Sequence, residues 1–176
     1  MTKNSIALIG FMGVGKTTIG KLLTQNLGID YKFIETDEII TQEAGKSVSR
    51  IFEEDGEERF REYEISACKK ASKLNRTVIS CGGGIVLNKI NIRNLKKNSY
   101  IVLLKATPEE IYKRVMKDGK ESRPLINMDE PKNEIEKILR VRSQLYKNAA
   151  EIIINTTGKK INDIINEIVK KTLLKT

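Results

Sequence analysis

Short apolar runs alternate along the chain with longer segments in which apolar residues recur every three or four positions. Each short run predicts a strand, because it is too short for a helix and is bounded by polar or turn-forming residues. The predicted strands are Ser5–Ile9, Tyr31–Ile34, Thr77–Ser80, Tyr100–Leu104 and Ile152–Asn155. The longer segments predict helices that follow Lys16, Asp37, Ser47, Glu57, Asn88, Thr107, Pro131 and Lys159. Strands that alternate with helices are typical of an α/β fold, in which helices cover both faces of a parallel sheet.

Length and composition limit the classes of protein that remain. A chain of 176 residues can form one α/β domain with a buried core. No apolar run approaches the roughly 20 residues that cross a bilayer, and Met1–Asn4 leads directly into the first predicted strand. Two cysteines are too few for a disulfide framework. The chain has no histidine, which excludes catalysis by a histidine base and metal sites with histidine ligands. We therefore expect a single domain over residues 1–176 in a cytoplasmic, monomeric protein without a membrane partner.

The formal net charge of +9 could suit a nucleic-acid partner. The lysines are spread along the chain, however, and pairs such as Lys69-Lys70 and Lys96-Lys97 are typical of solvated helix faces. Five tyrosines and four phenylalanines offer little surface for base stacking. We therefore expect no nucleic-acid partner, and we expect the positive charge to favour small anionic ligands.

The segment Gly10–Thr17 has the sequence Gly-Phe-Met-Gly-Val-Gly-Lys-Thr, between the first predicted strand and the first predicted helix. It matches the phosphate-binding P-loop, in which glycines let backbone N–H groups surround a phosphate at a helix N-terminus. Lys16 can reach the outer phosphates, and the Thr17 hydroxyl can hold Mg²⁺. The flanking elements argue against a chance glycine-rich turn, so the segment predicts a nucleoside triphosphate site at Gly13, Val14, Gly15, Lys16, Thr17 and Thr18.

A P-loop alone does not choose between a kinase, a GTPase and an ATPase motor. The chain lacks the Asn-Lys-x-Asp motif that recognises guanine, which weighs against a GTPase. It also lacks the run of four apolar residues ending in an adjacent pair of acids that is expected of an ATPase motor. It has Glu35-Thr36-Asp37 after the second predicted strand, where ligands bind in open α/β sheets. Thr36 or Asp37 could instead cap the next helix.

Two further segments favour a small-molecule acceptor. Arg61, within the acidic segment Gly56–Glu64, could pair with Glu58 or Glu64 or could clamp a substrate carboxylate. The three glycines Gly82–Gly84 follow a predicted strand, and they favour close approach of the backbone to a ligand over a floppy turn.

The polar segment from Lys117 to Glu130 has no clear apolar face and contains Gly119 and Pro124. Such a segment is usually a mobile surface connection. In a P-loop enzyme it could instead be a lid that excludes water, with Arg123 as its functional residue.

Together these segments resemble the shikimate kinase family of small P-loop kinases, over nearly the whole chain. The resemblance rests on the P-loop, Glu35–Asp37, Gly56–Glu64, Gly82–Gly84, Arg123-Pro124-Leu125 and Arg142-Ser143-Gln144-Leu145-Tyr146. It implies a three-layer P-loop kinase fold with a five-stranded parallel sheet, a helical substrate-binding region at about 36–66 and a lid at about 117–130. It also implies transfer of the ATP γ-phosphoryl group to the 3-hydroxyl of shikimate, which yields shikimate 3-phosphate and ADP.

The resemblance assigns roles by position. Lys16, Asp37 and Arg123 would be catalytic: Asp37 would bind the shikimate hydroxyls and accept the proton of the attacking one, and Arg123 would reach the ATP phosphates. Arg61 and Arg142 would bind the shikimate carboxylate.

Backbone and metal contacts also follow from the resemblance. Gly83 would contact the shikimate ring through its backbone, and Thr17 would ligate Mg²⁺ with Glu35 near the water shell of the metal. Two positions depart from the family, which usually has aspartate at position 35 and proline at position 144.

Three alternatives remain open. A related small-molecule kinase, such as a gluconate kinase, also binds a substrate with a carboxylate and hydroxyls. A nucleoside monophosphate kinase would accept AMP or another nucleotide. A non-catalytic nucleotide-binding protein would bind ATP without turnover.

Overall fold

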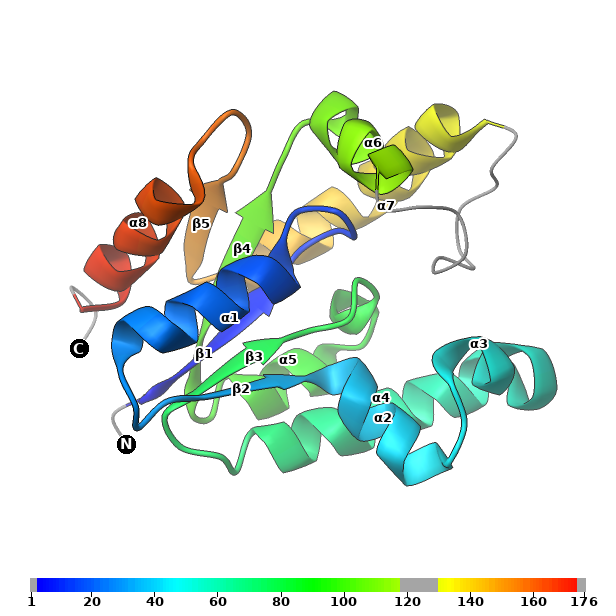
Figure 1. The fold of residues 1–176 in the computed structure, drawn as a ribbon. Helices are drawn as coiled ribbons and strands as arrows, with labels where there is room; N and C mark the ends of the chain where they lie inside the picture. The colour runs from blue at the N-terminus through cyan, green and yellow to red at the C-terminus, as the bar shows by residue number, and fades with distance from the viewer. Residues whose placement is uncertain (1–2, 118–129, 174–176) are drawn as a thin grey trace.

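Five parallel strands lie side by side in the order β2-β3-β1-β4-β5 in the computed structural model, which describes residues 3–117 and 130–173 (Figure 1). The strands are β1 (Ser5–Ile9), β2 (Lys32–Glu35), β3 (Thr77–Ser80), β4 (Ser99–Lys105) and β5 (Ile152–Asn155). All five predicted strands are confirmed, with β2 shifted by one residue and β4 longer by one residue at each end. Every residue of β1 is buried, as expected of a central strand in a sheet that is covered on both faces.

Helices cover both faces of this sheet, which confirms the predicted three layers (Figure 1). They are α1 (Lys16–Leu27), α2 (Thr36–Ala44), α3 (Val48–Arg50), η1 (Ile51–Asp55), α4 (Gly56–Ala71), η2 (Ile85–Leu87), α5 (Lys89–Leu95), α6 (Pro108–Lys117), α7 (Pro131–Ala149) and α8 (Ile161–Leu173). The helices α1 and α8 share one apolar cluster with Leu8 and Val102. The helices α4, α5 and α7 share another with Ile9 and Ile101. Within the described ranges, no helix is both long enough and apolar enough to span a membrane.

Local side-chain chemistry sets where some helices begin. The N–H of Glu110 donates to Thr107 Oγ1 at 3.3 Å, so Thr107 caps α6 as its sequence predicts. Helix α8 begins at Ile161, one residue after the start predicted by a helix that follows Lys159, and a turn at Gly158 with φ of 68° precedes it.

The segment after Ser47 differs from the simple helix that its sequence predicts. Ser47 caps a helix of three residues, α3, which continues as one π-helical turn, η1. Gly56 then has φ of 83°, a left-handed value that interrupts the helix before α4. The helices α2, α3, η1 and α4 form a unit beside the sheet with its own buried cluster, which includes Ile40, Ile51 and Phe60 (Figure 1).

Candidate active site

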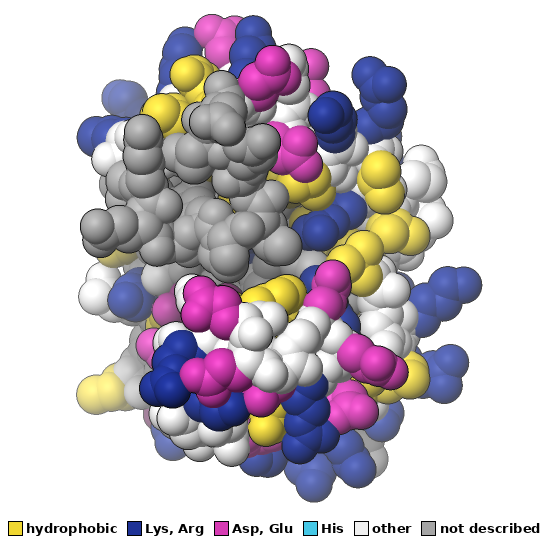
Figure 2. All heavy atoms as spheres, turned by 90° about the vertical axis from the view of Figure 1, so that its right-hand side faces the viewer, with side chains coloured by type: hydrophobic (Ala, Val, Ile, Leu, Met, Phe, Trp, Pro, Cys, Tyr) yellow, Lys and Arg dark blue, Asp and Glu magenta, His cyan; other side chains and the backbone are white. Residues whose placement is uncertain are grey.

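A cavity of about 810 Å³ opens where the carboxyl ends of β1, β2 and β3 meet. Its volume is within the range of small-molecule sites. The face of the molecule in Figure 2 carries acidic and basic side chains interspersed. Each predicted site residue that the structure describes lines this one cavity: Gly13, Val14, Gly15, Lys16, Thr17, Thr18, Asp37, Arg61, Gly83 and Arg142.

The P-loop connects β1 to α1 at one end of the cavity. The φ values of Gly10, Gly13 and Gly15 are 143°, 75° and 95°, which residues other than glycine rarely adopt. The Lys16 ammonium lies over the loop and donates to the carbonyl oxygens of Gly10 and Phe11, both at 2.9 Å. The loop therefore presents a cation and the N-terminus of α1 to the same part of the cavity.

The Thr17 hydroxyl donates to Glu35 Oε1 at 2.5 Å. Glu35 is the last residue of β2, and the P-loop follows the last residue of β1. Because the two strands are parallel and only β3 lies between them, the carboxylate of Glu35 lies beside the P-loop. Hydroxyl and carboxylate oxygens fit Mg²⁺, which keeps several waters and phosphate oxygens as its other ligands. Among residues 3–117 and 130–173 there is no cluster of three or more histidine, cysteine or acidic side chains that could hold a metal ion.

Asp37 lies in the first turn of α2 and faces the cavity. It does not cap the helix through its side chain, and neither does Thr36, whose Oγ1 instead accepts from the N–H of Gly82 at 2.9 Å. The Asp37 side chain is open to cavity water but is surrounded by protein on most sides. This partial desolvation raises its pKa, and the nearby positive charge of Lys16 offsets only part of the effect. A carboxylate with a raised pKa is a better proton acceptor.

Two of the three glycines after β3, Gly82 and Gly84, leave no room for a side chain. A Cβ on Gly82 would lie 2.9 Å from Asp37 Oδ1, and a Cβ on Gly84 would lie 2.9 Å from Arg61 Nη2. These two glycines let the side chains of Asp37 and Arg61 pack against the backbone, which argues against the alternative of a floppy turn. Cys81 lines the cavity with little exposure, and burial raises the pKa of its thiol, so it is a small buried side chain as expected.

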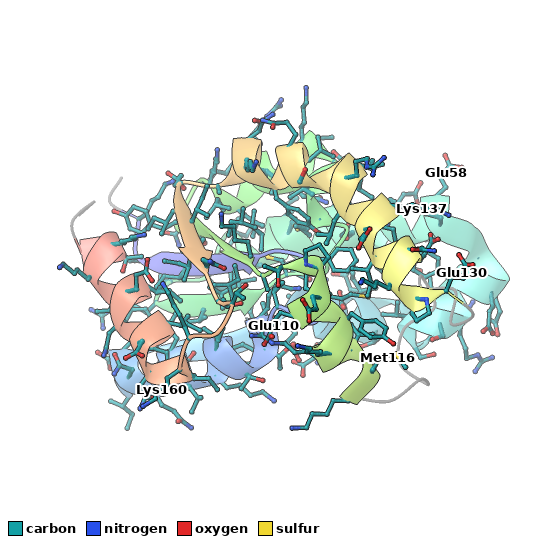
Figure 3. The ribbon with its side chains drawn as sticks, turned by 90° about the horizontal axis from the view of Figure 1, so that it is seen from above. Glu58, Glu110, Met116, Glu130, Lys137 and Lys160 are labelled. Carbon is teal, nitrogen blue, oxygen red and sulfur yellow. The ribbon has the colours of Figure 1, made fainter. Side chains whose placement is uncertain are left out.

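Arg61 pairs with acids of its own helix and also lines the cavity. Its Nη1 donates to Glu64 at 3.0 and 3.1 Å, and its Nη2 donates to Glu57 at 2.9 Å. Glu58, the other candidate partner, points outward from α4 (Figure 3). A guanidinium has five N–H donors, so these pairs leave donors for a substrate carboxylate.

Two side chains of α7 meet the second of the three glycines. The Gly83 carbonyl accepts from Arg142 Nη1 at 3.4 Å and from the Tyr146 hydroxyl at 2.5 Å. Burial raises the pKa of Tyr146 to about 12, so its hydroxyl stays protonated as a donor at neutral pH. Tyr146 belongs to a motif that the sequence singles out, but its contact with Gly83 becomes visible only in the structure.

Arg114 on α6 is a cavity residue that sequence reasoning missed. Its guanidinium donates to the carbonyl of Val14 and to Oγ1 and the carbonyl of Thr156, each at 3.3 Å. It thereby joins the P-loop to the connection after β5. Arg114 also forms an ion pair with Glu110, which Figure 3 labels. In the sequence, an arginine and a glutamate four residues apart look like an ordinary solvated pair on a helix, so the sequence does not single out Arg114.

The predicted lid begins at the edge of the cavity. Lys117, the last residue of α6, lines the cavity. Met116 and Glu130, which flank the segment, lie on the same side of the molecule (Figure 3). Arg123 and most of the predicted lid, residues 118–129, lie outside the described residues.

Comparisons with known proteins agree with this geometry. The family model described as shikimate kinase matches residues 12–173. The shikimate kinase of Caldanaerobacter subterraneus subsp. tengcongensis is 42% identical over 166 residues, 94% of each chain. That of Caldicellulosiruptor bescii is 43% identical over 152 residues, 86% of each chain.

Solved structures give the same result. A shikimate kinase from Acinetobacter baumannii in complex with shikimate is similar with a TM-score of 0.90 and 29% identity, over 99% of this chain and 96% of that one. A gluconokinase from Sinorhizobium meliloti 1021 shares the fold with a TM-score of 0.63, over 97% of this chain and 92% of that one, but at 12% identity the likeness extends to the fold alone.

Proposed function

Because this chain belongs to the shikimate kinase family, we propose that the cavity between the P-loop and α4 performs the reaction of that family. The protein transfers the γ-phosphoryl group of ATP to the 3-hydroxyl of shikimate, with shikimate 3-phosphate and ADP as products. One observation carries the assignment of the site. Residues far apart in the sequence, from the P-loop, α2, α4, the glycine segment and α7, line a single cavity.

The phosphate end is made by the P-loop. Backbone N–H groups and Lys16 neutralise the charge of the γ-phosphoryl group as it leaves ADP, and this neutralisation together with positioning supplies most of the catalysis in phosphoryl transfer. Thr17 would hold Mg²⁺, and Glu35, hydrogen-bonded to it, would bind the water shell of the metal. When bound, Mg²⁺ adds positive charge at the phosphate oxygens.

The acceptor end is made by Asp37, Arg61, Arg142 and Gly83. The two arginines bind the shikimate carboxylate, since the planar guanidinium matches its two oxygens. Asp37 orients the 3-hydroxyl and takes its proton as the oxygen attacks the γ-phosphorus and the bond to the bridging β–γ oxygen breaks. The proton ends on Asp37 and the electron pair on ADP.

Arg123 completes the proposed site from the lid. Its contact with the phosphates would add a further cation to the transferring group, and an arginine in such a role contributes roughly 10³–10⁵ to the rate. The variant Arg123→Ala, assayed beside the wild type at saturating ATP and shikimate, tests the role through kcat. We also propose that the protein acts in the cytoplasm, where ATP is supplied and where the buried Cys68 and Cys81 stay reduced. We further propose that it acts as a monomer.

ADP release from Mg-ATP tests the function, with shikimate, gluconate, AMP and no acceptor in parallel reactions. Release that depends on shikimate is the expected result. Release with gluconate or AMP would keep the phosphate end and overturn the acceptor end. Without release in any reaction, but with ATP bound, the protein would be a non-catalytic nucleotide binder.

A further inference from the structure

Asn91 lies on α5, behind the acceptor end of the cavity, and is fully buried. Its Nδ2 donates to Glu64 Oε2 at 3.1 Å and to the carbonyl oxygen of Ile85 at 3.2 Å. Its Oδ1 is buried as well, without a hydrogen bond from any residue that the structure describes. A buried acceptor without a partner costs stability, so a residue of this kind calls for a compensating role.

The two partners of Nδ2 determine how the amide is oriented. Glu64 Oε2 and the Ile85 carbonyl are both acceptors, so the NH₂ group must face them. Rotation of the amide by 180° would bring Oδ1 against a carboxylate and a carbonyl. Asn91 therefore gives Glu64 Oε2 a second donor beside Arg61 Nη1.

Glu64 is the buried partner of Arg61. Its side chain is 1% exposed, whereas that of Glu57, the other acid that Arg61 contacts, is 61% exposed. An exposed ion pair restrains an arginine weakly, because water competes for both groups. The direction of the Arg61 guanidinium thus depends mainly on Glu64. Burial raises the pKa of Glu64, and the positive charge of Arg61 offsets only part of this effect.

We propose that Asn91 is a positioning residue for the acceptor substrate: it holds the Glu64 carboxylate in place, and Glu64 holds Arg61 against Gly84, where it receives the shikimate carboxylate. This inference rests on the proposed role of Arg61. Asn91 itself touches neither substrate nor the cavity. It acts through two hydrogen-bonded steps, from α5 to α4 and from α4 to the cavity.

Two variants of Asn91 test the proposal, with a matched control on the same helix. Asn91→Leu removes both donors at similar volume, and Asn91→Asp keeps the shape but places a second acid beside Glu64. Asn94→Leu is the control, because Asn94 is also buried on α5 but its Oδ1 accepts from Lys97. The measurements are kcat, KM for shikimate and KM for ATP, together with the thermal shift that shikimate produces.

We expect KM for shikimate to rise about tenfold in Asn91→Leu, because this variant loses one hydrogen bond to a charged group. The rise should be larger in Asn91→Asp, because that variant places a second acid beside Glu64. The KM for ATP and kcat per folded enzyme should stay within about twofold. A merely structural role would lower the active fraction and leave KM for shikimate unchanged. In a Glu64→Gln background, Asn91→Leu should add much less than it does alone.

Three results would overturn the proposal: unchanged KM for shikimate in both Asn91 variants, an equal rise in Asn94→Leu, or full additivity with Glu64→Gln. Arg61→Ala, measured in the same way, separates this proposal from the proposed function. If Arg61→Ala raises KM for shikimate but the Asn91 variants do not, the role of Asn91 alone fails. If Arg61→Ala leaves KM for shikimate unchanged, both the carboxylate site and the role of Asn91 fail.

Discussion

Two acids, Asp37 and Glu64, approach Gly82 within the acceptor end of the cavity. A Cβ on Gly82 would lie 2.9 Å from Asp37 Oδ1 and 3.6 Å from Glu64 Oε1. Glu64 is held by Arg61 and Asn91, whereas Asp37 faces the open cavity near Lys16. Two acids in different surroundings can serve different roles, and in our proposals Glu64 positions Arg61 while Asp37 accepts a proton.

The variant Asp37→Asn should lower kcat by about 10²–10⁴, the usual contribution of a general base. Desolvation raises the pKa of Asp37, so wild-type kcat/KM should fall on the acid side at a pH above the ordinary aspartate value of 3.8, and the variant should lack this limb. A pH–rate profile of both enzymes measures the effect. An unchanged acid limb in the variant would contradict the role.

The same raised pKa has a consequence for stability. An acid whose pKa is higher in the folded than in the unfolded protein contributes stability at low pH and loses it as the pH rises through the folded value. At neutral pH the ionised Asp37 therefore opposes folding, and Asp37→Asn should unfold at an equal or higher temperature than the wild type. A lower unfolding temperature at pH 7 would contradict this reasoning.

A second prediction at the residue scale concerns Tyr146, whose ring is 3% exposed. Tyr146→Phe keeps the packing but removes a donor from the Gly83 carbonyl, so the free energy of unfolding should fall by about 1 kcal/mol and KM for shikimate should rise. Denaturant unfolding and steady-state kinetics measure the two effects. Tyr31→Phe is the control, since Tyr31 precedes β2 at the opposite end of the sheet.

At the scale of elements, the sequence predicts the sheet well and the helical unit beside it less well. The strands are clear because the parallel sheet buries both faces and its strands read as continuous apolar runs, such as Ser5–Ile9. A break before α4 is predicted, since one helix is expected after Ser47 and the next after Glu57, but the shortness of α3 and the π-helical turn η1 were missed.

The candidate site shows the same division. Contiguous motifs such as Gly10–Thr17 predict cavity residues directly. Arg114, Asn91 and the contact of Tyr146 with Gly83 depend on which helices lie side by side, and no local pattern encodes that.

Two glycines flanking the acceptor region should respond differently to alanine. A Cβ on Gly56 meets no atom within 4 Å, but its φ of 83° is strained for alanine, so Gly56→Ala should cost about 1–2 kcal/mol of stability. Gly84 has φ of −89°, which alanine adopts freely, but its Cβ would displace the Arg61 guanidinium.

Gly84→Ala should therefore raise KM for shikimate about tenfold, equivalent to 1.4 kcal/mol of binding, with little change in unfolding. Denaturant unfolding and kinetics of the two variants separate a backbone effect from a side-chain effect. If Gly56→Ala and Gly84→Ala changed the free energy of unfolding and the KM for shikimate in the same way, this distinction between a backbone effect and a side-chain effect would be wrong.

At the scale of the whole molecule, the net charge of +9 acts on two anionic substrates. Salt screens such a field over about 10 Å at 0.1 M ionic strength. We expect KM for shikimate and for ATP to rise with sodium chloride, whereas kcat, which reflects the filled cavity, should change little. A neutral osmolyte at equal concentration is the control, and KM values independent of salt would show that the net charge does not assist binding.

The two ends of the cavity come from different parts of the chain. One continuous loop, Gly10–Thr17, forms the phosphate end, whereas α2, α4, the glycine segment and α7 form the acceptor end. A lineage can therefore replace residues at the acceptor end one by one while it inherits the phosphoryl-donor machinery intact. Descendants of one ancestral kinase could in this way specialise on different metabolites, and their ATP-binding loops would stay recognisable long after the rest of their sequences had diverged.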